Sequence, residues 1–168
     1  MNFYHWGKER MMQFLVGYNG SNASKSALSL ARDHAKIFNA RVLVLFSTEG
    51  GASETLEDIS QAESDLKNAS DFLAEAGIAS ETLEDISRAE ADLKYAKDFL
   101  TEAGVSSEAH QLARGMTPGE DLVSFAEENN IDQIFVGIEK KSKTRKLLLG
   151  STAQYVILKA SCPVVTIK

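Results

Sequence analysis

Short apolar runs alternate with amphipathic stretches along most of the chain. The apolar runs, which have the pattern of buried strands, lie at 13–18, 41–47, 109–115, 131–137 and 163–168. Between them, apolar residues recur every three or four positions, as on the buried face of a helix. Strands that alternate with helices are typical of a parallel sheet covered by helices on both faces. The pattern therefore predicts an α/β fold with an open, five-stranded parallel sheet.

Helix-start signals support this division of the chain. The residues NGS turn the first strand into a helix expected at 21–38, and a short helix is expected at about 150–160. The clearest signal is Thr117 as N-cap, Pro118 at the first helical position and Glu120 as the capping-box partner. Pro163 cannot donate a hydrogen bond to a neighbouring strand. We therefore expect the last strand at an edge of the sheet, where a second protomer would cover it.

A tandem repeat interrupts the alternation between the second and third strands. Residues 52–78 and 79–105 are two copies of one 27-residue segment, identical at 21 positions. Each copy has the apolar stripe of one amphipathic helix, and Gly77 and Gly104 lie where such a helix would stop. The stripes are Leu56, Ile59, Ala62, Leu66, Ala69, Leu73 and Ala76 in the first copy, and Leu83, Ile86, Ala89, Leu93, Ala96, Leu100 and Ala103 in the second.

The place of the added copy is open at this point. One full helix crosses from one end of a sheet to the other, so a second would leave the chain at the wrong end. Either one copy is largely loop, or the pair forms a projecting hairpin, or the segment is exchanged between protomers. The repeat carries 14 acidic and 4 basic residues. Its polar surface is interpreted as a solvated helix face or as a partner-binding arm.

Composition narrows the possible classes of protein. A chain of 168 residues, 43% of them hydrophobic and 25% charged, is long enough for one domain with a core. No apolar run is long enough for a membrane helix, and residues 1–12 lack the apolar core of a secretory signal. The single Cys162 excludes an internal disulfide and suits a reducing compartment. The net charge of −6 comes from the acidic repeat; this local acidity argues against broad nucleic-acid binding but not against a basic pocket for one anion. We treat residues 1–11 as an N-terminal extension of this single domain.

A basic loop follows the fourth predicted strand. Gly137 ends that strand, and Gly150, Ser151 and Thr152 begin the next helix. Free N–H groups at a helix start form an anion site, to which hydroxyls add donors. The pattern points to phosphate, although a solvated loop and an ordinary N-cap are the simpler interpretations. The basic residues of the loop are Lys140, Lys141, Lys143, Arg145 and Lys146.

Four stretches together resemble the universal stress protein family: FLVGYNGSNASKSAL, ARVLVLFS, IDQIFVG and KLLLGSTAQYVILKASCPVV. The resemblance covers nearly the whole chain except about eleven N-terminal residues and one repeat. It implies the strand order 3-2-1-4-5. ATP-binding members carry G-x2-G-x9-G-[ST], which Gly137, Gly150 and Ser151 match, whereas Lys140 replaces the second glycine. The first-strand aspartate of the family falls on Asn19.

The resemblance also implies a ligand and its site. The ligand is ATP or AMP, with or without Mg²⁺, and its phosphates would lie near Ser151 and Thr152. The adenine contact from the second strand falls on Ser47. The residues that the resemblance assigns to nucleotide binding are Tyr18, Asn19, Ser47, Val136, Gly137, Lys140, Gly150, Ser151 and Thr152.

Two functional hypotheses follow. The first is a cytoplasmic, dimeric protein that binds ATP or AMP and acts as a nucleotide-responsive regulator. The second is a nucleotide-free family member that acts through dimerisation and its acidic duplicated helices. No nucleophile, base and orienting group stand together in the sequence, so we predict no enzyme and name no catalytic residue. One cysteine and three scattered histidines predict no metal site, and we expect neither a nucleic-acid nor a membrane partner.

Overall fold

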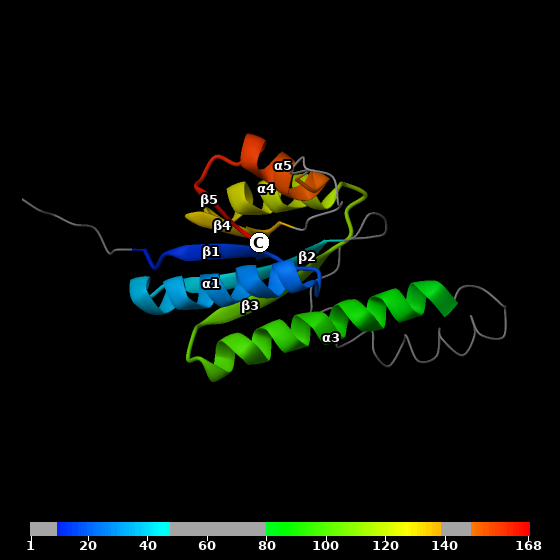
Figure 1. The fold of residues 1–168 in the computed structure, drawn as a ribbon, viewed down its shortest axis with the longest axis horizontal. Coiled ribbons are helices and arrows are strands. Elements are labelled where there is room, and N and C mark those ends of the chain that lie inside the picture. Colours follow the sequence, from blue (N-terminus) through cyan, green and yellow to red (C-terminus); the bar gives the residue numbers. More distant parts are fainter. Residues whose placement is uncertain (1–9, 48–79, 139–148) are drawn as a thin grey trace, which may run out of the picture.

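The computed structural model describes residues 10–47, 80–138 and 149–168. Within them it has nine elements in the alternating order that the hydrophobic pattern predicts (Figure 1). The strands are β1 (Gln13–Gly17), β2 (Arg41–Ser47), β3 (Ser107–Leu112), β4 (Gln133–Gly137) and β5 (Val164–Ile167). The helices are α1 (Asn22–Phe38), α3 (Ser80–Glu102), α4 (Pro118–Glu128) and α5 (Ser151–Lys159).

The five strands form one parallel sheet in the order β3-β2-β1-β4-β5, which confirms the predicted fold class and strand order. β1 lies at the centre, where Val16 is in register with Val44 of β2 and Phe135 of β4. β5 is an edge strand, and Pro163 precedes it directly. The sheet therefore brings the carboxyl ends of β1, β2 and β4 side by side.

Successive residues of each central strand point to opposite faces of the sheet. Phe14 and Val16 pack with α1 and α3 in one apolar cluster, whereas Leu15 packs with α4 and α5 in a second. Figure 1 shows these two pairs of helices on opposite sides of the sheet. The two clusters explain why the central strands are apolar at nearly every position, as in other buried parallel sheets.

The capping signals are confirmed at α4, whereas the third strand is displaced from its predicted place. Thr117 caps α4 and forms a reciprocal capping box with Glu120. The third strand was predicted at 109–115, but β3 begins at Ser107 and ends at Leu112. Among the described strands this edge strand pairs only with β2. Polar residues such as Ser107 and Glu108 extend it, where the hydrophobic pattern gives no signal. Gly115 adopts a positive φ of 72° in the turn that follows.

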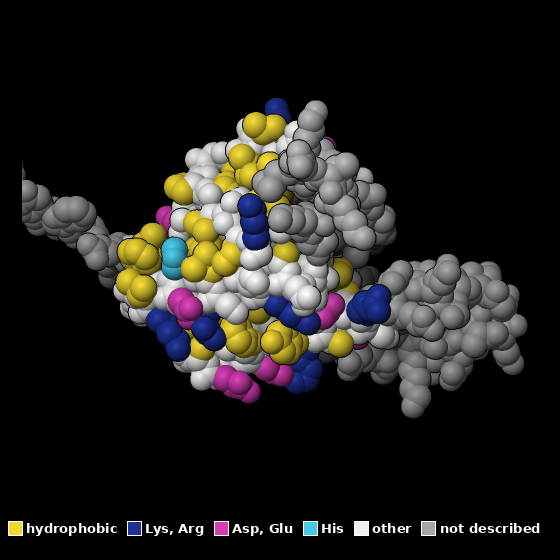
Figure 2. All heavy atoms as spheres, viewed as in Figure 1, with side chains coloured by type: hydrophobic (Ala, Val, Ile, Leu, Met, Phe, Trp, Pro, Cys, Tyr) yellow, Lys and Arg dark blue, Asp and Glu magenta, His cyan; other side chains and the backbone are white. Residues whose placement is uncertain are grey.

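The helix between β2 and β3 is the second copy of the repeat. α3 buries Ala89, Leu93, Ala96 and Leu100 against the sheet and α1. Lys25 of α1 lies over the Tyr95 ring, 5.4 Å from its centroid. Acidic and basic side chains mix on the exposed side of α3 (Figure 2). The first copy and the end predicted at Gly77 lie outside the described residues, whereas Gly104 follows the end of α3 with a φ of 72°.

The six positions at which the repeats differ avoid this buried stripe. Five of them are exposed on or beside α3, and at the sixth the buried Val105 takes the place of Ile78. The first copy therefore carries the same four small and apolar residues at 62, 66, 69 and 73. Among the described helices, none is long and apolar enough to cross a membrane.

Deletion of residues 52–78 is expected to leave the sheet intact, because α3 supplies the buried contacts of this crossover. The thermal midpoint should change by less than about 5 °C. Leu93→Asp buries a carboxylate and should prevent folding of the shortened chain. In the full chain the same substitution should cost less, because Leu66 offers the same side chain in the other repeat. Thermal unfolding of the full and the shortened chain, each with and without Leu93→Asp, tests this. Failure of the shortened chain to fold without the substitution would contradict the prediction.

Candidate functional site

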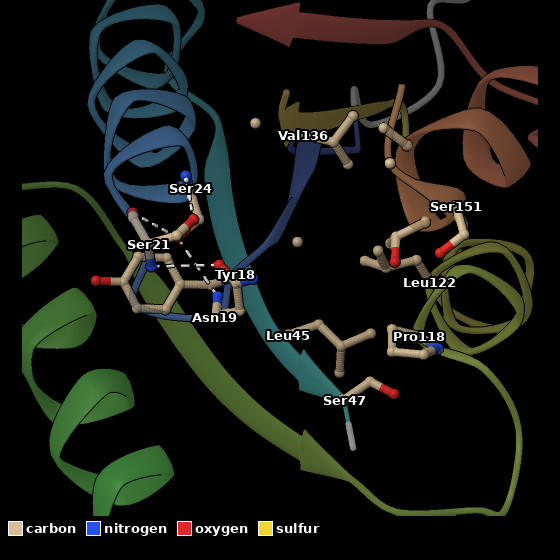
Figure 3. A pocket seen from close by; sticks show the side chains of 15 residues that line it. Tyr18, Asn19, Ser21, Ser24, Leu45, Ser47, Pro118, Leu122, Val136 and Ser151 are labelled. Atoms are coloured by element: carbon tan, nitrogen blue, oxygen red, sulfur yellow. Dashed lines mark hydrogen bonds between the residues drawn. The ribbon is translucent and has the colours of Figure 1, made fainter. Parts of the chain in front are cut away.

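A cavity of about 220 Å³ opens where the carboxyl ends of β1, β2 and β4 meet the starts of α1, α4 and α5 (Figure 3). β1 connects to β2 on one side of the sheet and β4 connects to β5 on the other, so the chain diverges between β1 and β4. Ligands of open α/β sheets bind in the crevice at such a point. The fold therefore defines the class of site before any side chain is considered.

The residues that line the cavity are uncharged in the part of the chain that the structure describes. Its electrostatics there depend on hydrogen-bonding groups, on helix dipoles and on the buried Asp121 side chain, to which the lining residue Ser47 is hydrogen-bonded. Both α1 and α5 begin at the cavity, and a helix start carries partial positive charge and unpaired N–H groups. The arrangement therefore favours an anionic group.

The turn from β1 into α1 is held by its own polar side chains. Asn19 Oδ1 accepts a hydrogen bond from the Ser21 N–H at 3.2 Å, and Ser21 Oγ accepts one from the Ser24 N–H at 3.2 Å. Gly20 has a φ of 74°, and the Asp92 carboxylate of α3 lies where a Cβ at Gly20 would be, within 2.1 Å. The Asn19 oxygen keeps one further lone pair, and the NH₂ group of that side chain can donate to a ligand.

The start of α5 differs from the starts of α1 and α4. Gly150 is its N-cap and has no side chain to accept a hydrogen bond, whereas Ser21 and Thr117 cap the other two helices. Gly150, Ser151, Thr152 and Ala153 all line the cavity. The first N–H groups of α5 therefore have no side-chain cap, as in anion sites at helix starts.

The end of β2 forms a different part of the cavity wall. Ser47 lines it beside the apolar residues Leu45, Pro118 and Leu122. Ser47 Oγ donates a hydrogen bond to Asp121 Oδ2, and Asp121 is 0% exposed. Asp121 Oδ1 has no hydrogen-bond partner among the described residues.

Val136 and Gly137 bring the end of β4 to the cavity. A Cβ added at Gly137 would lie 2.2 Å from the backbone carbon of Ala23 and 2.7 Å from the backbone nitrogen of Ser24. The glycine therefore lets the first turn of α1 lie directly against β4. This packing role of Gly137 is separate from the place at the nucleotide site that the resemblance gives it.

Tyr18 lies at the cavity, but its phenol points away from it toward α3 (Figure 3). Burial raises the pKa of this phenol to about 12, and the nearby Asp92 carboxylate and Tyr95 act in the same direction. The phenol therefore stays neutral at ordinary pH. Any contact from Tyr18 to a ligand in the cavity would come from its backbone.

Eight of the nine residues predicted at the site line this one cavity, and the ninth, Lys140, lies outside the described residues together with the rest of the basic loop. Their role in nucleotide binding stays a prediction. Sequence reasoning missed Ser21 and Ser24 of α1, and Pro118 and Leu122 of α4. Ser21, Ser24 and Pro118 follow soon after the end of a strand, which is the signal that could have found them, whereas Leu122 is brought to the cavity by α4. No cluster of metal-ligating side chains occurs among the described residues.

Comparison with known families agrees with this class of fold and site. The profile of the universal stress protein family matches residues 11–168. The chain therefore belongs to the universal stress protein family.

Individual relatives are similar over part or all of the chain. A curated universal stress protein of Methanocaldococcus jannaschii is 41% identical over 51 residues, which is 30% of this chain and 30% of that protein. A universal stress protein structure from Archaeoglobus fulgidus has 30% identity and a TM-score of 0.67, covering 94% of this chain and 93% of its own. Another structure from that organism, in complex with dAMP, has 26% identity and a TM-score of 0.62. The match covers 95% of this chain and 98% of that chain.

Proposed function

We propose that this protein binds an adenine nucleotide, ATP or AMP, in the cavity at the carboxyl ends of β1, β2 and β4. The observation that carries the proposal is the start of α5, where an N-cap without a side chain leaves N–H groups for an anion. Ser151 and Thr152 add hydroxyl donors beside them. A phosphate there would gain hydrogen bonds and a favourable helix dipole.

The rest of the cavity suits the nucleoside part of such a ligand. Gly137 and Ser47 end strands that lie on either side of β1, so these ends are about 10 Å apart at the usual strand spacing of about 4.8 Å. This separation is comparable to the length of a mononucleotide. With phosphate at α5, the base would lie against Leu45, Pro118 and Leu122, and apolar walls of this kind suit flat rings.

The A. fulgidus relative that was solved with dAMP supports the same ligand class. We propose that binding, rather than turnover, is the function, so that the protein responds to nucleotide as a regulator. Mg²⁺ would enter with the phosphates of ATP.

We further propose a dimer through β5, because Val164, Val165 and Ile167 stay partly exposed on an edge strand of the single chain.

The test is calorimetric titration of the full chain with AMP, and with ATP and Mg²⁺, with GTP as the competitor. We expect adenine-selective binding with a dissociation constant in the micromolar range, which corresponds to a binding free energy of about −8 kcal/mol. Light scattering of the same sample should give twice the mass of one chain. Absence of binding up to millimolar nucleotide would overturn the proposal and favour a nucleotide-free protein that acts through its acidic repeat.

A further inference from the structure

Large hydrophobic side chains are exposed together where α1 ends and β1 begins. Ile37 and Phe38, in the last turn of α1, are 75% and 54% exposed, and Met12, directly before β1, is 38% exposed. The Phe38 ring meets the Phe14 ring edge-on, with the centroids 6.3 Å apart. Met12 stands two residues before Phe14 in extended chain, so its side chain points to the same face of the sheet. We call Met12, Ile37 and Phe38 the α1-end patch.

The patch is the main concentration of exposed hydrophobic side chains in the described part of the chain. Seven large hydrophobic side chains are exposed there, and four of them lie at this end: Met11, Met12, Ile37 and Phe38. Figure 2 shows hydrophobic side chains gathered at the end of the molecule where α1 ends and β1 begins. Neighbouring exposed apolar side chains are typical of a contact surface. This end is opposite the cavity, so the patch serves something other than the proposed nucleotide site.

The chain before β1 is held on the side of the sheet where the patch lies. Arg10 pairs with Asp132 at 2.7 Å, and Asp132 directly precedes β4. The same side of α1 lies over β4, because the His34 and Phe135 rings are 5.3 Å apart. Ile37 is three residues beyond His34 and therefore on that side of the helix. Residues 1–9, which are outside the described residues, thus connect to the fold beside the patch.

These nine residues carry an unusual number of aromatic side chains. Phe3, Tyr4 and Trp6 occur within four residues, in a chain that is 8% aromatic overall. Trp6 precedes Arg10 by four residues, so it lies at most about 14 Å from Arg10 along an extended chain. Gly7 permits a tight turn between them. Aromatic side chains bury large apolar areas and often act as anchors at contacts. The segment therefore has both the reach and the chemistry to cover the patch.

We propose that residues 1–9 dock on the α1-end patch of the same chain, with Trp6 as the main anchor. The indole of Trp6 packs against Ile37 and Phe38, which lose their contact with water. The docked segment closes the amino end of the sheet between α1 and β4. This contact does not depend on the proposed nucleotide function, and either can fail without the other.

Fluorescence of the full chain tests the proposal, because Trp6 is its single tryptophan. Docking removes the indole from water, so the folded protein should emit at a shorter wavelength than the urea-unfolded chain. Ile37→Ser should shift the emission of the folded protein to the wavelength of the unfolded chain. Ile37 is 75% exposed, so its replacement leaves the core intact, and circular dichroism checks this. Phe38→Ser should give the same shift.

Leu158→Ser is the matched control. Leu158 is 71% exposed, but it lies on α5, which covers the opposite face of the sheet. This substitution should leave the emission of Trp6 unchanged. An equal shift in Leu158→Ser and Ile37→Ser would mean that the segment does not dock on the patch.

Three other results would overturn the proposal. The first is wild-type emission at the wavelength of the unfolded chain, which means that Trp6 stays in water. The second is unchanged emission in both Ile37→Ser and Phe38→Ser when they are folded. The third is a short-wavelength emission that disappears on dilution as light scattering shows dissociation, which means that the segment binds a second copy. Emission that does not depend on protein concentration and shifts only in the two patch variants confirms docking within one chain.

Discussion

Replacement of Gly150 with aspartate should abolish nucleotide binding without weakening the fold. Gly150 has a φ of −60° and a ψ of 151°, which aspartate adopts readily at an N-cap, and no atom of the described residues lies within 4 Å of an added Cβ. The new carboxylate would accept hydrogen bonds from the first N–H groups of α5, which stabilises a helix start. It would also place a negative charge where we propose that phosphate binds. We expect affinity to fall about 100-fold or more, because like charges about 4 Å apart repel by a few kcal/mol at a protein surface.

Two further substitutions at the same position separate the effect of the negative charge from the effect of occupying the N–H groups of α5. Gly150→Asn occupies the same N–H groups without charge and should lose less affinity than Gly150→Asp. Gly150→Ala adds only a methyl group and should keep affinity within a few-fold. Calorimetric titration with AMP measures binding, and thermal unfolding should place Gly150→Asp at or slightly above the wild type. Unchanged AMP binding by folded Gly150→Asp would show that the anion does not lie at α5.

Much of the fold could be predicted because the central strands are buried on both faces. In the run at 41–47 the residues from Val42 to Leu45 are buried and apolar, whereas the polar Arg41 and Ser47 at its ends are only partly buried, so its limits are visible in the sequence. The limits of β3 are not visible in this way. Ser107 and Glu108 are only partly buried at the edge of the sheet, and their place in the strand is set by pairing with Val42 and Leu43 of β2. Backbone pairing of this kind leaves no pattern in the side chains.

The site was less predictable than the sheet, because its residues serve local structure as well. Ser21 is explained by the start of α1, and Pro118 by the start of α4. Nothing local shows that both helices begin at one cavity. Asp121 is harder still, because acidic residues in a first turn are usually exposed partners of the helix dipole. Only the packing of α4 on the end of β2 buries it beside Ser47.

The repeat shows where sequence reasoning stops. Periodicity gives both copies the same apolar stripe, so it cannot choose which copy crosses from β2 to β3. The contacts of α3 involve features that the first copy lacks, since Tyr95 stands under Lys25 where the first copy has Asn68. Asp92, which lies against Gly20 at the cavity, has the identical Asp65 in the first copy. The copies thus share the apolar residues that α3 buries and differ mainly at positions that are exposed on α3.

Gly137→Ala should destabilise the protein severely, although alanine is ordinarily a conservative change in a strand. The added methyl carbon would lie 2.2 Å and 2.3 Å from the backbone carbon and oxygen of Ala23. These are backbone atoms in the first turn of a buried helix, so no side-chain rotation relieves the contact. α1 and β4 would have to separate, which opens the packing of α1 on Phe135 as well. We expect a loss of about 3 kcal/mol or more, a large part of the 5–15 kcal/mol that stabilises an ordinary domain.

Urea denaturation measures this loss, with Gly150→Ala as the matched control. Both substitutions add one methyl group to a glycine on the rim of the same cavity, but no described residue comes within 4 Å of the methyl group added at Gly150. The control should lose less than about 1 kcal/mol, the cost of alanine at an N-cap. Equal midpoints for Gly137→Ala and the wild type would mean that β4 and α1 do not approach closely. A large loss would confirm that Gly137 lets the first turn of α1 lie against β4, at a residue that also lines the cavity of the proposed anion site.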